Sequence, residues 1–308
     1  MPDASSVTVI VNAGAGLGCP PDWASELEQK FAAHGVAAQV HLIHDGREIP
    51  EAATRAVQQH AGLVIAAGGD GTVSAVASRL AGSGVALGVL PMGTLNHFAK
   101  DLGIPLERDA AIEVIVRRHE IAVDAGDVNG RVFINNSSLG LYPDIVVDRE
   151  RQRRRLGRGK WRALLAACLH AARRYPVLTL GMEVDGKAIV RRSAFVFIGN
   201  NRYNMEGFDI GDRASISEGQ LSLYVTQRTG RFGLLRLALK ALARRLRQAE
   251  DFDMLMAREL VVHSARRQIR VANDGEVALM QTPLNYSIRP GALRVIVPFP
   301  EMPTPGGP

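Results

Sequence analysis

One stretch of the sequence constrains the fold more than any other, because in it an apolar run of strand length ends in a glycine-rich turn. Residues 63–72 read Leu-Val-Ile-Ala-Ala-Gly-Gly-Asp-Gly-Thr, and the apolar residues that follow recur at helical spacing. Such a turn leaves backbone N–H groups free at the start of the helix, which suits a phosphate group, and glycine lets the ligand come close. Asp70 would repel a bare phosphate, so the turn predicts a nucleotide phosphate with Mg²⁺ beside it. The alternative is an ordinary turn in which Asp70 and Thr72 cap the helix.

The first part of the chain alternates between strand and helix patterns. Beside the strand that opens residues 63–72, further elements follow from the apolar spacing: strands at 7–11, 36–43 and 85–90, and helices at 21–34, 50–60, 106–118 and a short one ending at 101. This alternation predicts a parallel sheet with helices on both faces. Ligands of such sheets bind beyond the carboxyl ends of the strands. The turns near Asn12, Gly68 and Gly93 all lie at such ends, so we expect them to converge.

From about residue 121 the pattern changes to short strands and hairpins. Asn129-Gly130, Asp185-Gly186 and Asp274-Gly275 each stand between strand-like runs, which is a strong hairpin signal. Further strands are predicted at 194–198, 220–226, 260–263, 284–288 and 293–297. We expect an antiparallel sandwich or barrel. The predicted domains are therefore 1–121 and 122–298, with the last strand free to pack back on the first domain and a disordered tail at 299–308.

Charge and composition limit the kinds of molecule that the protein is expected to bind. The net charge of +6 favours polyanions, but an aromatic content of 5% argues against a platform for single-stranded nucleic acid, and no nucleic acid is expected. The stretches 149–175 and 228–248 are basic and amphipathic, and they either lie on an anionic bilayer or pack on the protein's own sheet.

The same sequence bears on location. Cys19 and Cys168 match no metal spacing and are expected to be reduced thiols. We see no signal peptide and no apolar run of membrane-spanning length. The expected location is cytoplasmic, peripheral at the inner membrane face.

Two motifs together resemble those of one protein family. Gly68-Gly69-Asp70-Gly71-Thr72 and the run Pro91-Met92-Gly93-Thr94-Leu95-Asn96-His97-Phe98-Ala99-Lys100 resemble the bacterial diacylglycerol-kinase-like lipid kinases, which include sphingosine kinase relatives. The similarity continues through Asp124, through Asn136 to Gly140 and into Asp274-Gly275-Glu276, and so covers about residues 7–298. It implies a Rossmann-like parallel α/β domain, an antiparallel β-sandwich domain and an active site in the cleft between them.

The resemblance also implies an activity and a set of site residues. It implies ATP-dependent phosphorylation of a lipid hydroxyl, with a diacylglycerol-like or sphingoid acceptor, and leaves a homodimer open. Glu276 matches the presumed catalytic base, Asp70 and Asp124 would orient Mg²⁺ through water, and Glu218 matches a structural Mg²⁺ site where the family usually has Asp. The positions that match the family's nucleotide contacts are Asn12, Gly16, Gly68, Gly69, Asp70, Gly71, Thr72, Gly93, Thr94 and Asn96.

The chain departs from the family at several of these places. The family's first-turn proline is Ala13 here, its usual lysine and serine are Gly14 and Ala15, and the aspartate common after Asn96 is His97. Two further interpretations therefore stay open: a soluble NAD kinase, which shares the Gly-Gly-Asp-Gly loop, and a nucleotide- or lipid-binding regulator without turnover. The Asp274-Gly275-Glu276 run has its own alternative as a plain hairpin turn with an exposed Glu.

Overall fold

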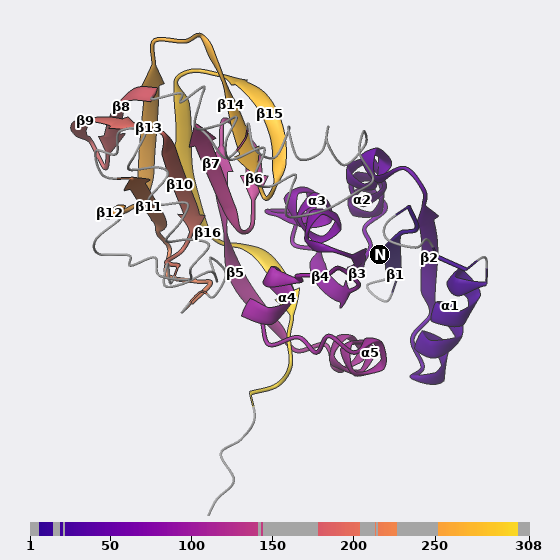
Figure 1. The fold of residues 1–308 in the computed structure, drawn as a ribbon. Coiled ribbons are helices and arrows are strands. Elements are labelled where there is room, and N and C mark those ends of the chain that lie inside the picture. Colours follow the sequence, from indigo (N-terminus) through magenta and orange to yellow (C-terminus); the bar gives the residue numbers. More distant parts are fainter. Residues whose placement is uncertain are drawn as a thin grey trace, which may run out of the picture. The chain divides into compact units, whose positions relative to one another are not determined.

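The computed structural model describes residues 6–14, 19–20, 22–140, 143, 178–203, 213, 215–226 and 252–300 (Figure 1). The chain forms two compact units, one of residues 1–123 with 292–308 and the other of residues 124–291.

A parallel sheet forms the centre of the first unit. Its strands are β1 (Val7–Asn12), β2 (Ala38–Ile43), β3 (Leu63–Gly68) and β4 (Ala86–Pro91), in the order β2-β1-β3-β4. Val7 lies opposite both Ala38 and Leu63, and Leu63 lies opposite Ala86, so the strands start in step and end at a common edge. The buried strand β3 confirms the prediction for residues 63–68, because every one of its side chains is buried.

Helices cover both faces of this sheet, as the alternating pattern predicts. They are α1 (Trp23–Ala33), α2 (Ile49–Gln58), α3 (Asp70–Leu80), α4 (His97–Asp101) and α5 (Arg108–Arg117), with a short 3₁₀ helix η1 (Gly46–Glu48) before α2. Helices α2 and α3 lie on one face, and α1 and α5 lie on the other (Figure 1). The predicted helix bounds differ from the observed ones by at most three residues, which is a usual uncertainty for helix ends predicted from sequence.

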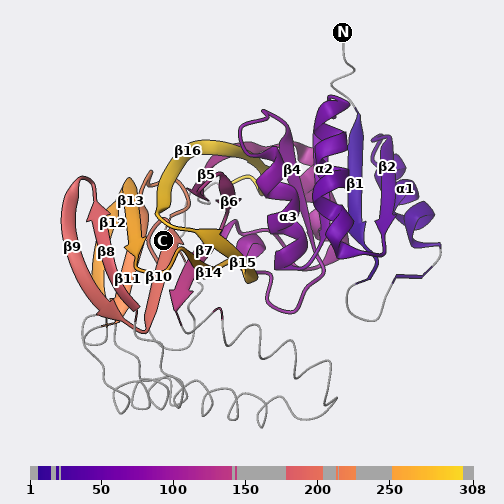
Figure 2. The same cartoon turned by 90° about the horizontal axis from the view of Figure 1, so that it is seen from above.

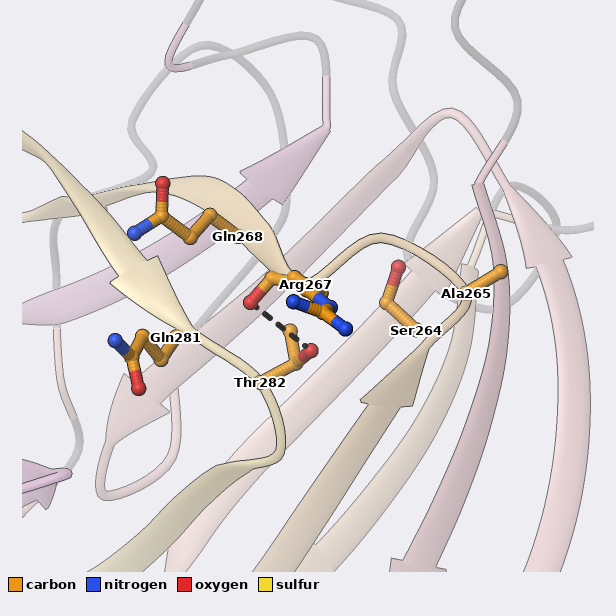
Figure 3. A pocket seen from close by; sticks show the side chains of 6 residues that line it. All are labelled: Ser264, Ala265, Arg267, Gln268, Gln281 and Thr282. Carbon is orange, nitrogen blue, oxygen red and sulfur yellow. Dashed lines mark hydrogen bonds between the residues drawn. The ribbon is translucent and has the colours of Figure 1, made fainter.

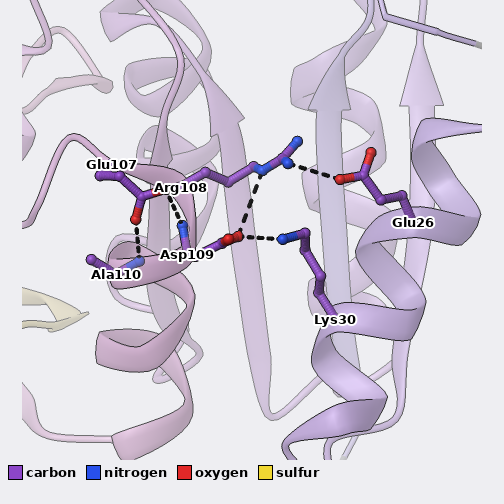
Figure 4. A network of polar contacts seen from close by, with 6 residues as sticks. All are labelled: Glu26, Lys30, Glu107, Arg108, Asp109 and Ala110. Atoms are coloured by element: carbon purple, nitrogen blue, oxygen red, sulfur yellow. Dashed lines mark hydrogen bonds and ion pairs between the residues drawn. The ribbon is translucent and has the colours of Figure 1, made fainter.

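Polar contacts join α1 to α5 on their shared face (Figure 4). Arg108 donates to Glu26 at 2.8 Å and lies over the Trp23 ring at 5.7 Å, and Lys30 pairs with Asp109 at 2.5 Å. These side chains are partly or largely exposed, so each pair adds little stability. They link the two helices that cover this face of the sheet.

The second unit is built from antiparallel strands (Figure 2). They are β5 (Glu120–Val128), β6 (Arg131–Phe133), β7 (Asn136–Gly140), β8 (Leu178–Val184), β9 (Lys187–Ser193), β10 (Phe195–Asn200), β11 (Leu221–Thr226), β12 (Phe252–Ala257), β13 (Glu259–Ser264), β14 (Gln268–Asn273), β15 (Glu276–Gln281) and β16 (Leu284–Ile296). One layer has the order β16-β13-β8-β9, and the other has the order β12-β11-β10-β7-β14-β15. The predicted sandwich is therefore correct.

The core of the second unit lies between these layers. Met182, Val262 and Tyr286 from one layer pack in the same cluster as Leu139 and Val271 from the other. Alternate residues on each strand point inward, which is the expected pattern for strands that are buried on one face.

The three hairpin turns confirm the sequence signal. The first turn residues Asn129, Asp185 and Asp274 have φ angles of 49°, 46° and 47°. The glycine after each also has a positive φ angle, as a type I′ turn requires.

One prediction in this region is wrong, and one strand was missed. Residues 284–288 and 293–297 were expected as separate strands, but Leu284–Ile296 is one strand. Its Pro290-Gly291 pair does not end the strand, because Gly291 adopts a φ of 59° and donates its N–H to Asp124 at 2.9 Å. The strand β12 (Phe252–Ala257) was not predicted. The end of β16 lies parallel to β4, with Arg294 opposite Ala86.

Several expectations fall outside the described residues: the basic stretches 149–175 and 228–248, Gly16, Cys168 and the end of the tail at 301–308. Within the described residues, no helix is long and apolar enough to cross a membrane.

Candidate active site

Two of the three predicted turns meet through a side-chain hydrogen bond in the first unit. Asn12, at the end of β1, donates its amide N–H to the Thr72 hydroxyl at 2.9 Å. Thr72 is buried and packs on Gly68, where an added Cβ would lie 2.4 Å from the Thr72 Oγ1. Only glycine therefore fits at position 68, and the turn after β3 is held against the end of β1.

The third turn touches the second through glycine backbones. A Cβ on Gly93 would lie 2.7 Å from the Gly69 Cα, and the Met92 N–H donates to the Gly68 carbonyl at 2.8 Å. The Asn96 side chain closes this loop on itself, because it accepts from the Gly93 N–H at 2.9 Å and donates to the Gly93 carbonyl at 3.0 Å. The loops of residues 68–72 and 93–96 thus form one continuous rim at the carboxyl end of the sheet.

The start of α3 opens onto this rim. Its N-cap is Gly69, which makes no side-chain cap bond, so the alternative in which Asp70 and Thr72 cap the helix is wrong. Nothing lies within 4 Å of a Cβ placed on the exposed Gly71. The first N–H groups of a helix have no intrahelical acceptor. The rim therefore offers backbone donors beside open space, which is the arrangement that a phosphate requires.

Asp70 lies at this rim, and one of its carboxylate oxygens accepts a weak hydrogen bond. Its Oδ1 accepts a long hydrogen bond of 3.4 Å from the Phe98 N–H at the start of α4. Within the described residues, no group of three or more His, Cys, Asp or Glu side chains could hold a metal ion. Asp70 fits a Mg²⁺ that is carried mainly by nucleotide phosphates, since Mg²⁺ often uses only one or two protein carboxylates.

Asp124 lies in the second unit, where its carboxylate ties three segments together. It accepts from the Gly219 N–H at 2.7 Å and from the Gly291 N–H at 2.9 Å, and it is buried. The neighbouring Glu218 donates its backbone N–H to the Asn201 side chain at 3.0 Å and keeps an exposed surface. The sequence did not indicate the structural contacts of Asp124, and the Mg²⁺ roles predicted for Asp124 and Glu218 stay predictions.

Glu276 is the first residue of β15, directly after the Asp274-Gly275 turn. Burial and then the negative charge of Asp274 raise the pKa of the Glu276 carboxyl, while Arg131 acts in the opposite direction. Glu276 keeps an exposed surface, so water screens these charges and limits the change. A carboxyl with a raised pKa is a stronger base for a hydroxyl proton.

A polar pocket elsewhere in the second unit involves none of the predicted site residues (Figure 3). It has a volume of about 630 Å³ and is lined by Ser264, Ala265, Arg267, Gln268, Gln281 and Thr282. The Thr282 hydroxyl donates to the Arg266 carbonyl at 2.8 Å and to the Arg267 carbonyl at 3.4 Å.

Comparison with known families matches nearly the whole described chain. The diacylglycerol kinase catalytic domain matches residues 6–128, and the YegS C-terminal NAD kinase beta sandwich-like domain matches residues 139–297. The chain belongs to the bacterial diacylglycerol kinase-like family. This kinase family was the one that the motifs resembled, so the resemblance is confirmed.

Curated relatives of this chain include a diacylglycerol kinase of Bacillus subtilis. The two are 29% identical over 226 residues, which cover 71% of this chain and 72% of the relative. A diacylglycerol kinase of Staphylococcus aureus is 28% identical over 186 residues, or 58% of this chain and 56% of the relative. An uncharacterized Synechocystis protein is 27% identical over 272 residues, or 85% of this chain and 62% of the relative. The chain thus spans less than two thirds of two of these proteins.

Solved structures have the same fold as this chain. A diacylglycerol kinase from Bacillus anthracis aligns with a TM-score of 0.68 at 19% identity, over 96% of this chain and 97% of that one. A second Bacillus anthracis structure aligns with a TM-score of 0.74 at 21% identity, over 96% and 98%. At these identities the likeness concerns the fold alone.

Proposed function

We propose that this protein is an ATP-dependent lipid kinase that transfers the γ-phosphate of ATP to the hydroxyl of a diacylglycerol-like or sphingoid lipid. The observation that carries the proposal is the contact between the loops of residues 68–72 and 93–96, beside which the first turn of α3 has free space at Gly71. Membership in a diacylglycerol kinase-like family supports the lipid acceptor.

Each of these residues has its own role in the proposed reaction. The N–H groups at the start of α3 hold the phosphates, and Asn12 and Asn96 keep the surrounding loops in place. Asp70 would hold a Mg²⁺ ion, which when bound neutralises phosphate charge. The lipid hydroxyl oxygen forms a bond to the γ-phosphorus, the bond to the bridging oxygen of ADP breaks, and Glu276 takes the hydroxyl proton. This step requires that Glu276 meets the nucleotide in one crevice, which stays a prediction.

The test is phosphorylation of a crude lipid extract and of pure diacylglycerol with labelled ATP and Mg²⁺. We expect a labelled phospholipid from the wild-type protein and at least about a 100-fold lower rate from Glu276→Gln, in the range of a lost general base. ATP binding without transfer to any lipid would contradict the proposal and would favour a regulator.

A second candidate function is a soluble NAD kinase, because the matching C-terminal family is described as NAD kinase beta sandwich-like. The two candidates differ in the acceptor. Parallel reactions with ATP and either NAD or diacylglycerol decide between them, since only one acceptor should become labelled.

The proposed lipid acceptor requires access to a membrane. We propose that the protein is cytoplasmic, binds the anionic inner face of the membrane peripherally and does not bind nucleic acid. The net charge of +6 supports contact with anionic lipid. Sedimentation with anionic and neutral vesicles measures this directly, and equal binding to both would contradict it.

A further inference from the structure

The Asp274 carboxylate binds three consecutive backbone N–H groups of one segment. Its Oδ1 accepts from Asn135 at 2.8 Å and from Asn136 at 2.9 Å, and its Oδ2 accepts from Ile134 at 2.9 Å. The Asp274 N–H in turn donates to the Asn136 carbonyl at 2.8 Å. Hydrogen bonds to an ionised acceptor are about twice as strong as neutral ones, so this contact fixes the turn between β14 and β15 firmly.

The segment that receives Asp274 is itself held from its other side. Arg213 and Asn200 donate to the Ile134 carbonyl at 2.7 and 2.9 Å. Arg213 also donates to the Asn135 side chain at 3.2 Å, and all of these contacts are buried. Asp274 therefore binds a part of the unit that has little freedom to move.

The next strand needs such support because it lies at an edge. In the described sheet β15 is the last strand and pairs with β14 alone, from Glu276 opposite Asn273 to Gln281 opposite Gln268. Glu276 is thus held by one neighbouring strand and by the turn before it.

In two other turns of the same type, the first turn residue also accepts backbone hydrogen bonds from a neighbouring segment. Asp185 accepts from the N–H groups of Arg258 and Glu259, both at 3.0 Å, and Asn129 accepts from Asn285 at 2.8 Å. Each turn thus uses its first residue to bind a neighbouring segment. Only Asp274 is followed by a residue to which we assign chemistry, so the Asp185 turn is a natural control.

We propose that Asp274 is a positioning residue, which holds Glu276 in place by binding the backbone of residues 134–136. This inference rests on the proposed function, in which Glu276 takes the hydroxyl proton. The charge of Asp274 has a second effect, because together with burial it raises the pKa of Glu276 against the opposing charge of Arg131.

The experiment compares Asp274→Asn with Asp185→Asn in the full-length protein. Asp274→Asn keeps one acceptor oxygen and should fold, and Asp274→Ala is a second, harsher variant. We expect Asp274→Asn to lower kcat at least about 10-fold, because small misplacements of a reacting group are costly, with KM for ATP changed less than twofold. We expect Asp185→Asn to keep kcat within about twofold at a similar loss of thermal stability. Equal and near-wild-type kcat in both variants would overturn the inference.

The pH profile gives a readout that a purely structural role would not move. Removing the charge of Asp274 should shift the acid limb of kcat/KM to lower pH, and Asp185→Asn should leave the limb unchanged. Titration of the ¹³C-labelled Glu276 carboxyl by NMR, assigned with Glu276→Gln, should show the same shift without any turnover. An unshifted titration in Asp274→Asn would contradict the effect of the Asp274 charge on Glu276, and the comparison of kcat decides the positioning.

The two proposals can fail separately. If Glu276→Gln keeps the wild-type rate, the proposed base is wrong. If Glu276→Gln is inactive while Asp274→Asn is not impaired, only the positioning inference is wrong.

Discussion

Replacing Gly71 by alanine should separate the stability of the fold from its ability to bind a nucleotide. Gly71 lies in the first turn of α3 at a helical φ, and nothing lies within 4 Å of the added Cβ. Alanine in a helix is more favourable than glycine by roughly 0.5–1 kcal/mol. With about 2–4 °C per kcal/mol for a protein of this size, the Gly71→Ala variant should melt about 1–4 °C higher than the wild type.

The same methyl group should weaken ATP binding. The methyl group would fill the space beside the first N–H groups of α3, where we place the phosphates. No protein atom lies within 4 Å of it. We expect at least about a 10-fold rise in the Kd for ATP, or about 1.4 kcal/mol. Calorimetric titration with ATP and Mg²⁺ measures the Kd, and a thermal melt without ATP measures the stability.

Ser78→Ala provides the matched control on the same helix. Ser78 donates its hydroxyl to the Ala75 carbonyl one turn earlier, at 2.9 Å, and it has no assigned role in binding. This variant should keep the wild-type Kd. A Gly71→Ala variant that is stabilised and binds ATP as tightly as the wild type would refute the phosphate site at α3.

Three further predictions concern the contacts around the candidate site. Gly93→Ala should destabilise the protein by about 1–3 kcal/mol, measured by urea unfolding, because its Cβ would meet Gly69 at 2.7 Å. Asp124→Asn should lower stability by about 1–3 kcal/mol with or without Mg²⁺, because its amide must face the N–H of Gly219 or Gly291; an effect seen only with Mg²⁺ would contradict this. Glu276 has a raised pKa in the folded state, so its ionisation disfavours folding above that pKa and has no effect below the pKa of the unfolded chain. Glu276→Gln should therefore melt higher than the wild type at pH 7 and equally at pH values below about 4, and a reversed order would contradict the sign.

Local patterns in the sequence predict most of the fold, and long-range contacts explain what they miss. The continuous apolar run of β3 and the three glycine-containing hairpin turns are signals carried by neighbouring residues. The Pro290-Gly291 pair gives the same kind of signal for a chain break, yet the strand continues. The reason is the Asp124 carboxylate, which lies 167 residues away and binds the Gly291 N–H. No window of sequence contains both partners.

In the candidate site, too, local patterns were predictable from the sequence and long-range contacts were not. The Gly68–Thr72 run predicts a phosphate turn by itself, because the glycines, the acidic residue and the strand-to-helix context are adjacent. The contacts of Asp274 cross 138–140 residues, so the sequence showed only a turn residue there. A glycine also does not reveal what it must approach: Gly69 and Gly93 touch each other, and neither position shows this in the sequence.

The geometry of the first turn explains why the family's usual side chains are absent from it. A Cβ on Gly14 would lie 2.3 Å from the His44 carbonyl oxygen, and the Ala13 N–H donates to the Ile43 carbonyl at 2.8 Å. The turn therefore lies against the end of β2, where a lysine has no room without a shift of the backbone. The site loses a possible cation from this turn and keeps the Asn12 contact to Thr72. The phosphate binding that we propose would then depend on backbone N–H groups more than on side-chain charge, which is why a single methyl group at Gly71 should have such a large effect.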